Sequence, residues 1–150
     1  MATAEISITV ERPLEEVFAY IVNIKNLNEW VSVVLDSWPV SGNLPEAGSI
    51  YIVKAQIMGK TMEILSEVVD YKPNRLYAYK SYGFLTYVDT MLLEETKNGT
   101  LVTEHLDMKS EGRFLRLLDP LKLIISKRSH LKNQQQLKRI LEGGKVAVLA

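Results

Sequence analysis

Residues 84–108 read FLTYVDTMLLEETKNGTLVTEHLDM, and the architecture of the chain can be inferred outward from this segment. Asn98-Gly99 separates two runs rich in alternating and β-branched residues, which predicts a β-hairpin closed by a tight turn. The triplet Asn98-Gly99-Thr100 also matches the acceptor pattern for N-glycosylation, but the sequence carries no secretory address, so the turn is the preferred interpretation. The predicted cross-strand pairs are Glu95 with Thr100, Leu93 with Val102, Met91 with Glu104, and Asp89 with Leu106.

Two carboxylates, Asp89 and Glu104, fall on the apolar face of this hairpin. A dry core is an unfavourable place for an acid. Either a β-bulge shifts the side-chain parity and exposes both acids, or they line a wet or ligand-filled cavity in which they offer hydrogen bonds. In such a cavity a carboxylate with a raised pKa is a candidate general base, so Asp89 and Glu104 are the candidate catalytic residues.

The rest of residues 31–108 has a similar composition, with runs of β-branched and aromatic residues separated by short turns. Short connections predict antiparallel neighbours, because a parallel pair needs a connection of about a dozen residues or more. The predicted strands cover residues 6–10, 33–40, 49–57, 61–71, 76–82, 84–93 and 100–108. Together they predict a seven-stranded antiparallel meander.

Two short helices are predicted between the first and second strands. Pro13 suits a first helical position because its φ is already helical. The apolar residues that follow recur at helical spacing, namely Leu14, Val17, Phe18 and Ile21. A second short helix is predicted to end at Trp30, whose indole would close one end of the fold.

Residues 113–142 predict a long C-terminal helix, which Pro120 interrupts and Gly143-Gly144 ends. Its apolar residues fall on two nearly opposite faces, the first set before residue 126 and the second after residue 136. One straight helix cannot bury both sets against one sheet. We therefore expect a kink or slip between Asp119 and His130.

The composition is that of one ordinary globular domain, residues 1–150, with 47% hydrophobic and 24% charged side chains. The formal net charge is zero, so we expect no recruitment of nucleic acid by a strong overall field. Residues 111–150 nevertheless hold nine basic side chains against three acidic ones, which favours this segment as a docking surface. With no signal region and no apolar run long enough to span a membrane, a cytoplasmic location is expected.

Motifs for nucleotide or metal chemistry are missing from the sequence. The glycines form no phosphate-binding loop and no nucleophile elbow. There is no cysteine, and the two histidines, His105 and His130, stand 25 positions apart in no recognised ligand spacing. We therefore predict no cofactor and no metal.

Several segments resemble the START-related SRPBCC superfamily, which includes polyketide cyclase/dehydrase and lipid transport-like proteins and Bet v 1-like proteins. The similar segments are residues 6–18, 28–30, 67–76, 98–103 and 137–142. The resemblance implies an α+β helix-grip fold, in which a seven-stranded curved antiparallel sheet wraps a long C-terminal helix and two short helices follow the first strand. It also implies an internal cavity. Members bind lipids, sterols, plant hormones or polyketides, and a minority catalyse cyclisation or dehydration.

The preferred hypothesis is that the protein binds or carries a small hydrophobic ligand between the sheet and the C-terminal helix. Burial of apolar ligand surface would drive binding, and polar groups in the cavity would select among ligands. Arg128 and the two acids would orient the ligand. The predicted ligand-binding residues are Trp30, Tyr79, Tyr87, Met91, Leu106, Phe114, Leu117, Leu121 and Arg128.

Other interpretations stay open at this point. One is a polyketide cyclase or dehydratase that uses Asp89 or Glu104 as base and a tyrosine hydroxyl as oxyanion donor. Another is a protein-partner module that acts through the basic terminal helix. Phe114, Leu117 and Leu121 are either plain core or a movable lid, and the basic face of the helix is either solvated or in transient contact with an anionic membrane surface. The oligomeric state is left undetermined.

Overall fold

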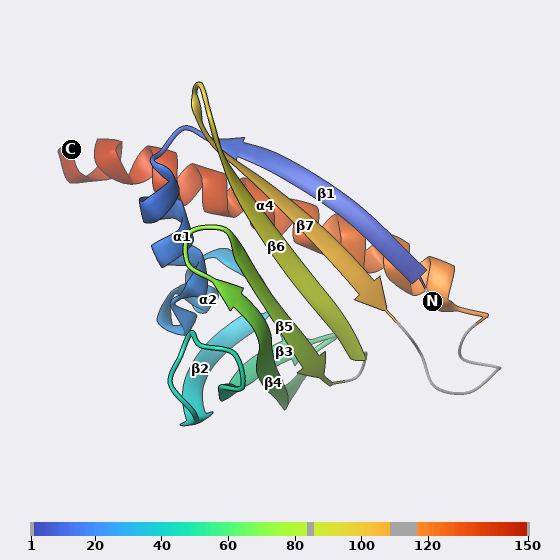
Figure 1. The fold of residues 1–150 in the computed structure, drawn as a ribbon. Helices are drawn as coiled ribbons and strands as arrows, with labels where there is room; N and C mark the ends of the chain where they lie inside the picture. The colour runs from blue at the N-terminus through green and yellow to red at the C-terminus, as the bar shows by residue number, and fades with distance from the viewer. Residues whose placement is uncertain (1, 84–85, 109–116, 150) are drawn as a thin grey trace.

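The structure, a computed structural model, describes residues 2–83, 86–108 and 117–149. A seven-stranded antiparallel sheet curves over one long helix (Figure 1), and its strand order is β1-β7-β6-β5-β4-β3-β2. The strands are β1 (Ala2–Val10), β2 (Val34–Ser41), β3 (Ile50–Ile57), β4 (Lys60–Lys72), β5 (Leu76–Tyr82), β6 (Thr86–Thr96) and β7 (Gly99–Met108). The helices are α1 (Leu14–Val22), η1 (Ile24–Asn26), α2 (Leu27–Trp30) and α4 (Asp119–Leu149). The predicted α+β helix-grip fold is confirmed.

The β6–β7 hairpin has the register expected from its turn. Glu95 pairs with Thr100 and Asp89 with Leu106, and no register shift interrupts the two strands. Burial alternates along β7 from Thr100 to Met108. The irregular pairings lie between β2 and β3 and between β4 and β5 instead. The bulge interpretation is therefore wrong for this hairpin, and both acids face the interior.

The short helices close one end of the sheet (Figure 1). α1 follows Pro13 directly, and the buried positions of this helix are Val17, Phe18 and Ile21. At the end of α2, the Trp30 side chain is also buried. These side chains join Val68, Leu93 and Leu137 in one hydrophobic core, so the closing helices, the sheet and α4 share a single interior.

Helix α4 departs from two of the expectations. It begins at Asp119, so Pro120 lies in the first turn, where a missing amide hydrogen costs nothing, and the helix then runs without interruption past His130. It also continues through Gly143-Gly144 to Leu149, because a helical glycine costs only about 1 kcal/mol. Of the predicted residues 113–142, residues 113–116 lie outside the described part of the chain.

Of the two apolar faces expected for the C-terminal helix, one is buried and the other is exposed. The side chains that face the interior are Asn133, Gln134, Leu137 and Leu141. Those of the first apolar set are largely exposed, namely Leu117, Leu118, Leu121, Ile124 and Ile125. Two polar residues thus occupy positions on the buried face that a periodicity argument assigns to apolar ones.

Ionic contacts fix the C-terminal half of α4 to the start of the chain. Lys138 Nζ donates to the Thr9 carbonyl oxygen at 2.7 Å and to Glu142 Oε2 at 2.6 Å. The same Glu142 oxygen accepts the Glu11 amide at 2.7 Å. Slight burial raises the pKa of Glu142, but these donors outweigh it and hold that pKa below its ordinary value. The contacts align α4 along β1, which positions residues 130–134 beneath β6 and β7.

Candidate functional site

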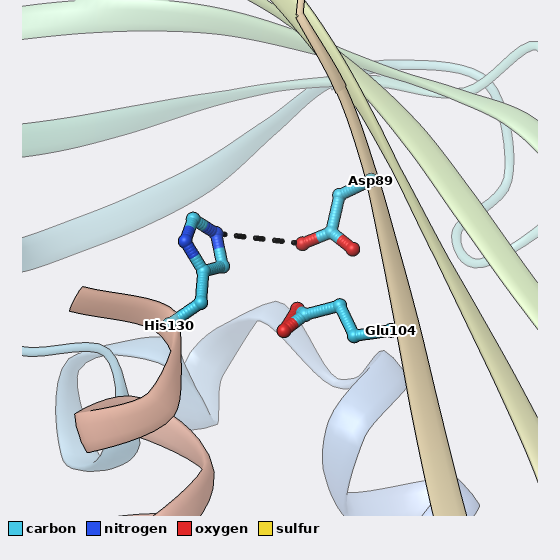
Figure 2. A group of neighbouring side chains, drawn as sticks. All are labelled: Asp89, Glu104 and His130. Carbon is cyan, nitrogen blue, oxygen red and sulfur yellow. Dashed lines mark ion pairs between the residues drawn. The ribbon is translucent and has the colours of Figure 1, made fainter. Parts of the chain in front are cut away.

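Asp89, Glu104 and His130 meet in the interior between the sheet and α4 (Figure 2). Asp89 lies on β6 and Glu104 on the neighbouring β7, and α4 contributes His130. One ligand atom from each side chain lies within 4.8 Å of the others. Asp89 is 0% exposed and Glu104 2%. Ionisable groups buried this deeply are rare unless they are paired or functional.

Two more polar side chains complete what we call the polar cluster, defined as Tyr79, Asp89, Glu104, His130 and Gln134. The Tyr79 hydroxyl donates to Asp89 Oδ2 at 3.0 Å. The Gln134 amide donates to Glu104 Oε1 at 3.5 Å. His130 Nε2 lies 3.6 Å from Asp89 Oδ2, which is too long for a good hydrogen bond.

The other ring nitrogen of His130 fixes the state of the imidazole. Nδ1 lies 2.8 Å from the Ser126 carbonyl oxygen, and a carbonyl only accepts, so Nδ1 carries the hydrogen. In the neutral ring, Nε2 then presents a lone pair to the Asp89 carboxylate. Two acceptors facing each other is an unfavourable arrangement, which a hydrogen or a cation between the two atoms would relieve.

Burial also controls the acids. It is the main cause that raises the pKa of Glu104 well above its ordinary value, and the charge and hydrogen bond of Asp89 raise that pKa further. Burial raises the pKa of Asp89 too, whereas His130 and the hydrogen bond from Glu104 oppose the shift. The two acids therefore titrate as one coupled pair, and the contacts that oppose the shift make Asp89 its more acidic member.

The tyrosines around the cluster are neutral hydrogen-bond donors. Burial raises the pKa of Tyr79 well above its ordinary value, and raises the pKa of Tyr87 to about 12. Tyr87 packs edge-on against both Tyr79 and the His130 ring, with centroid separations of 6.2 Å and 6.1 Å. These contacts orient the imidazole and place a phenol beside the carboxylates.

Several buried polar atoms in the described residues have no hydrogen-bond partner. Asp89 Oδ1 and Gln134 Oε1 belong to the polar cluster, and Trp30 Nε1 lies in the adjoining core. A buried polar atom without a partner costs about 1–3 kcal/mol. On the side of the sheet that faces α4, these three atoms therefore receive no hydrogen bond from the protein itself.

The predicted ligand-binding residues divide by position. Trp30, Met91 and Leu106 are buried, and Tyr79 and Tyr87 are half-buried. By contrast, the α4 members of the set are exposed, namely Leu117, Leu121 and Arg128. Phe114 lies outside the described residues. The structure thus brings the strand residues and Trp30 together around the acids, and does not bring Leu117, Leu121 or Arg128 to them.

Sequence reasoning identified both acids and missed His130 and Gln134. The signal that marks them is their spacing, because His130 and Gln134 precede the buried Leu137 and Leu141 by seven residues each, two helical turns. Extending the apolar face of α4 backwards from these leucines leads to His130 and Gln134. The spacing between His105 and His130 could not reveal the cluster, because the two acids that meet His130 come from strands β6 and β7.

One surface pocket of the described residues lies elsewhere. It has a volume of about 310 Å³ and is lined mainly by residues of the β4–β5 turn and the outer face of β5, β6 and β7, including Arg75, Leu92 and Thr103. It does not contain the polar cluster. Among the described residues, no helix is long and apolar enough to cross a membrane.

Comparison with known proteins identifies relatives of the whole chain. Residues 1–139 match the family described as polyketide cyclase/dehydrase and lipid transport. No curated protein sequence matches. Among solved structures, Ara h 8.0201 is 18% identical with a TM-score of 0.76, and the match covers 95% of this chain and 98% of that one. A protein from Thermus thermophilus is 18% identical with a TM-score of 0.77, covering 95% and 99% of the two chains. A START superfamily protein from Mycobacterium smegmatis is 11% identical with a TM-score of 0.77, covering 94% and 97%.

Proposed function

Because the chain belongs to the polyketide cyclase/dehydrase and lipid transport family, we propose that it binds a small hydrophobic ligand, of the lipid, sterol or polyketide class, between the sheet and α4. The ligand carries at least one polar group, which reaches the polar cluster. Its apolar body lies along the buried side chains of Trp30, Met91 and Leu106. Burial of that body contributes about 25 cal/mol per Å² of apolar surface.

The observation that carries this proposal is the set of unpartnered polar atoms. Trp30 Nε1 is a donor, whereas Asp89 Oδ1 and Gln134 Oε1 are acceptors, and all three are buried without a partner. A ligand hydroxyl or carbonyl would satisfy these atoms, and the apolar remainder of the ligand would replace water in the interior. Proteins satisfy most of their buried polar atoms, with a protein group or an ordered water molecule, so a neighbouring partner is expected for these three.

The exposed part of α4 supports a second element of the proposal. Leu121, Ile124 and Ile125 are each at least half exposed, and Lys127 and Arg128 follow them on the exposed helix. An apolar strip beside basic side chains suits transient contact with an anionic membrane surface. Leu117, Leu121 and Arg128 would then contact the ligand as it enters or leaves, and the protein would act in the cytoplasm.

Binding is tested with the neutral fluorescent probe N-phenyl-1-naphthylamine and with native mass spectrometry of the purified full chain. We expect wild type to enhance probe fluorescence and to retain a co-purifying lipid. Met91→Trp fills the interior and should weaken probe binding at least about tenfold, because the added ring occupies the ligand volume. Thr90→Trp is the matched control, since Thr90 is the adjacent residue on the outer face of β6 and its replacement should leave binding unchanged.

The proposal fails if wild type neither binds the probe nor retains any lipid. Equal loss in both tryptophan variants would show that destabilisation, rather than filling of the interior, is responsible. Circular dichroism of both variants separates these outcomes. Tyr79→Phe, which removes one hydroxyl and adds no volume, provides a second variant whose folding is not in question.

One contact favours a catalytic alternative, namely a cyclase or dehydratase. The Tyr79 hydroxyl donates to Asp89 Oδ2 at 3.0 Å, so a base and a neutral oxyanion donor lie side by side. In that reaction Asp89 removes a proton next to a substrate carbonyl, and the phenol donates to the resulting enolate. We expect deuterium exchange at the α-carbon of an acyl N-acetylcysteamine thioester in D₂O to exceed the buffer rate, and to fall to that rate in Asp89→Asn. Exchange at the buffer rate with wild type would contradict this alternative.

A further inference from the structure

We propose that Asp89, Glu104 and His130 form a binding site for a divalent transition-metal cation such as Zn²⁺ or Mn²⁺. The cation would occupy the polar end of the site proposed for the hydrophobic ligand, and its binding can be measured without that ligand, because it needs only the three side chains. One imidazole nitrogen and two carboxylates are ligand types that both cations accept in proteins. The sequence analysis predicted no metal, since it could consider only spacing along the chain.

The distances suit a cation at the centre of the three groups. One ligand atom of each side chain lies within 4.8 Å of the others, and His130 Nε2 is 3.6 Å from Asp89 Oδ2. Two ligands about 2.0 Å from a tetrahedral zinc ion stand about 3.3 Å apart. Small rotations of the two carboxylates would therefore complete the site. A separation of 3.6 Å is less suitable for a direct hydrogen bond.

The orientation of His130 is that of a metal ligand. Its Nδ1 hydrogen is directed at the Ser126 carbonyl oxygen, 2.8 Å away, which leaves the Nε2 lone pair aimed at the acids. Metal-ligating histidines almost always donate their other ring hydrogen to a carbonyl or carboxylate in this way. Figure 2 shows the ring edge facing Asp89, with the Glu104 carboxylate below the same space. Edge-on packing of Tyr87 against the ring holds this orientation.

Charge balance gives the third argument. Two carboxylates that are at least 98% buried carry a large desolvation cost when both are ionised. A divalent cation would neutralise both at once, whereas a shared proton neutralises only one. No Lys or Arg side chain is paired with Asp89 or Glu104 in the described residues.

A fourth side chain, that of Gln134, also supports a ligand at this site. Gln134 is 3% exposed, and its Oε1 is buried without a hydrogen-bond partner. Its amide group lies beside the cluster, because Nε2 contacts Glu104 Oε1 at 3.5 Å. Three protein ligands leave a fourth coordination position on zinc. Gln134 Oε1, or a water molecule held by it, would fill that position.

The experiment uses the full chain, stripped with EDTA and dialysed, and titrated separately with ZnCl₂ and MnCl₂ by calorimetry. We expect about one cation per chain, confirmed by elemental analysis, and a higher Tm with the cation than without it. His130→Gln and Glu104→Gln should each weaken binding at least about tenfold. His105→Gln is the matched control, since the other histidine is half-exposed on β7, 3.7 Å from the exposed Glu5, and should bind as wild type does.

A spectroscopic measurement guards against surface binding and misfolding. Co²⁺ bound by the nitrogen and oxygen ligands of the site should give visible absorption bands, and these should disappear in His130→Gln but not in His105→Gln. Wild type that binds neither cation, or binding that is equal in all the variants, would overturn the metal site. Probe binding by the EDTA-stripped chain is measured in parallel, so failure of the metal site and failure of the hydrophobic site are distinguished.

Discussion

Replacing the whole polar cluster by apolar side chains is expected to stabilise the metal-free protein by about 1–4 kcal/mol, while binding is lost. The substitutions are Tyr79→Phe, Asp89→Val, Glu104→Leu, His130→Leu and Gln134→Leu, which keep the approximate volume of the interior. The gain arises because the folded protein no longer has to bury two carboxylates and an imidazole. The apolar side chains also remove Asp89 Oδ1 and Gln134 Oε1, two buried atoms that have no hydrogen-bond partner in the native interior.

The opposite result is expected from His130→Leu alone. This change removes the imidazole that faces Asp89 Oδ2 and leaves the 0% exposed carboxyl group without that neighbour. Breaking a buried pair from one side costs about 3–5 kcal/mol. Urea denaturation of both variants and of wild type, each treated with EDTA, measures the two effects.

If the quintuple variant has a higher free energy of unfolding than wild type and His130→Leu has a lower one, the polar cluster lowers the stability of the protein and is present for another reason. A quintuple variant that is clearly less stable than wild type would instead show that the cluster is a structural element. In that case the unpartnered atoms would not support the proposed binding. The quintuple variant also serves as a binding control for both the fluorescent probe and the cation titrations.

The second large effect is expected at the β6–β7 turn. Gly99 has a φ of +149°, a conformation that L side chains rarely adopt, and a Cβ built there would overlap the Val10 carbonyl oxygen and lie 2.8 Å from Glu11 Cα. Backbone atoms of β1 cannot move aside as a flexible side chain can. Gly99→Ala should therefore lower the free energy of unfolding by about 3 kcal/mol or more, from backbone strain and steric overlap together.

Gly143→Ala is the matched control for this prediction. Gly143 lies within α4, and a Cβ built there meets nothing within 4 Å. Alanine is favoured over glycine in a helix by about 1 kcal/mol, so this variant should be slightly more stable than wild type. Thermal and urea denaturation of the two variants give the comparison. Equal stability of Gly99→Ala and wild type would mean that the turn and the first strand are not held together as described.

The sequence sufficed for the sheet because its signals are local. The turn signal around Asn98-Gly99 predicts a hairpin, whose two turn residues are Lys97 and Asn98, and a turn of known length determines the register of the strands that it joins. Asp89 and Glu104 could therefore be placed on one face before any coordinates were considered. The alternation of polar and apolar residues could not exclude a bulge elsewhere, and bulges do occur between β2 and β3 and between β4 and β5.

The C-terminal helix shows where local signals mislead. Pro120 and Gly143-Gly144 disfavour a continuous helix by only a modest free energy. Packing of the helix against β1 and α2 outweighs this cost. Apolar residues of the first turns were expected inside because hydrophobic patterns usually mark a buried face. Ile124 and Ile125 are exposed instead, and the interior positions are occupied by Asn133 and Gln134. Hydrophobic periodicity cannot predict a polar residue that is buried for its hydrogen bonds.

Through its short turns the amino-acid sequence by itself determined the strand order, and the alternation along the predicted β6–β7 hairpin placed Asp89 and Glu104 on one face, since both depend on neighbours within a few residues. The helix-grip arrangement was implied by the resemblance to a family, and the structure decided that the face with both acids points inward. Only the tertiary structure added His130 and Gln134 to those acids. Their contact joins β6 and β7 to a helix that begins eleven residues after β7 ends, and its rotation is set by packing against the whole sheet rather than by local propensity. The chemistry of the interior therefore depends on one helix face that no local pattern specifies.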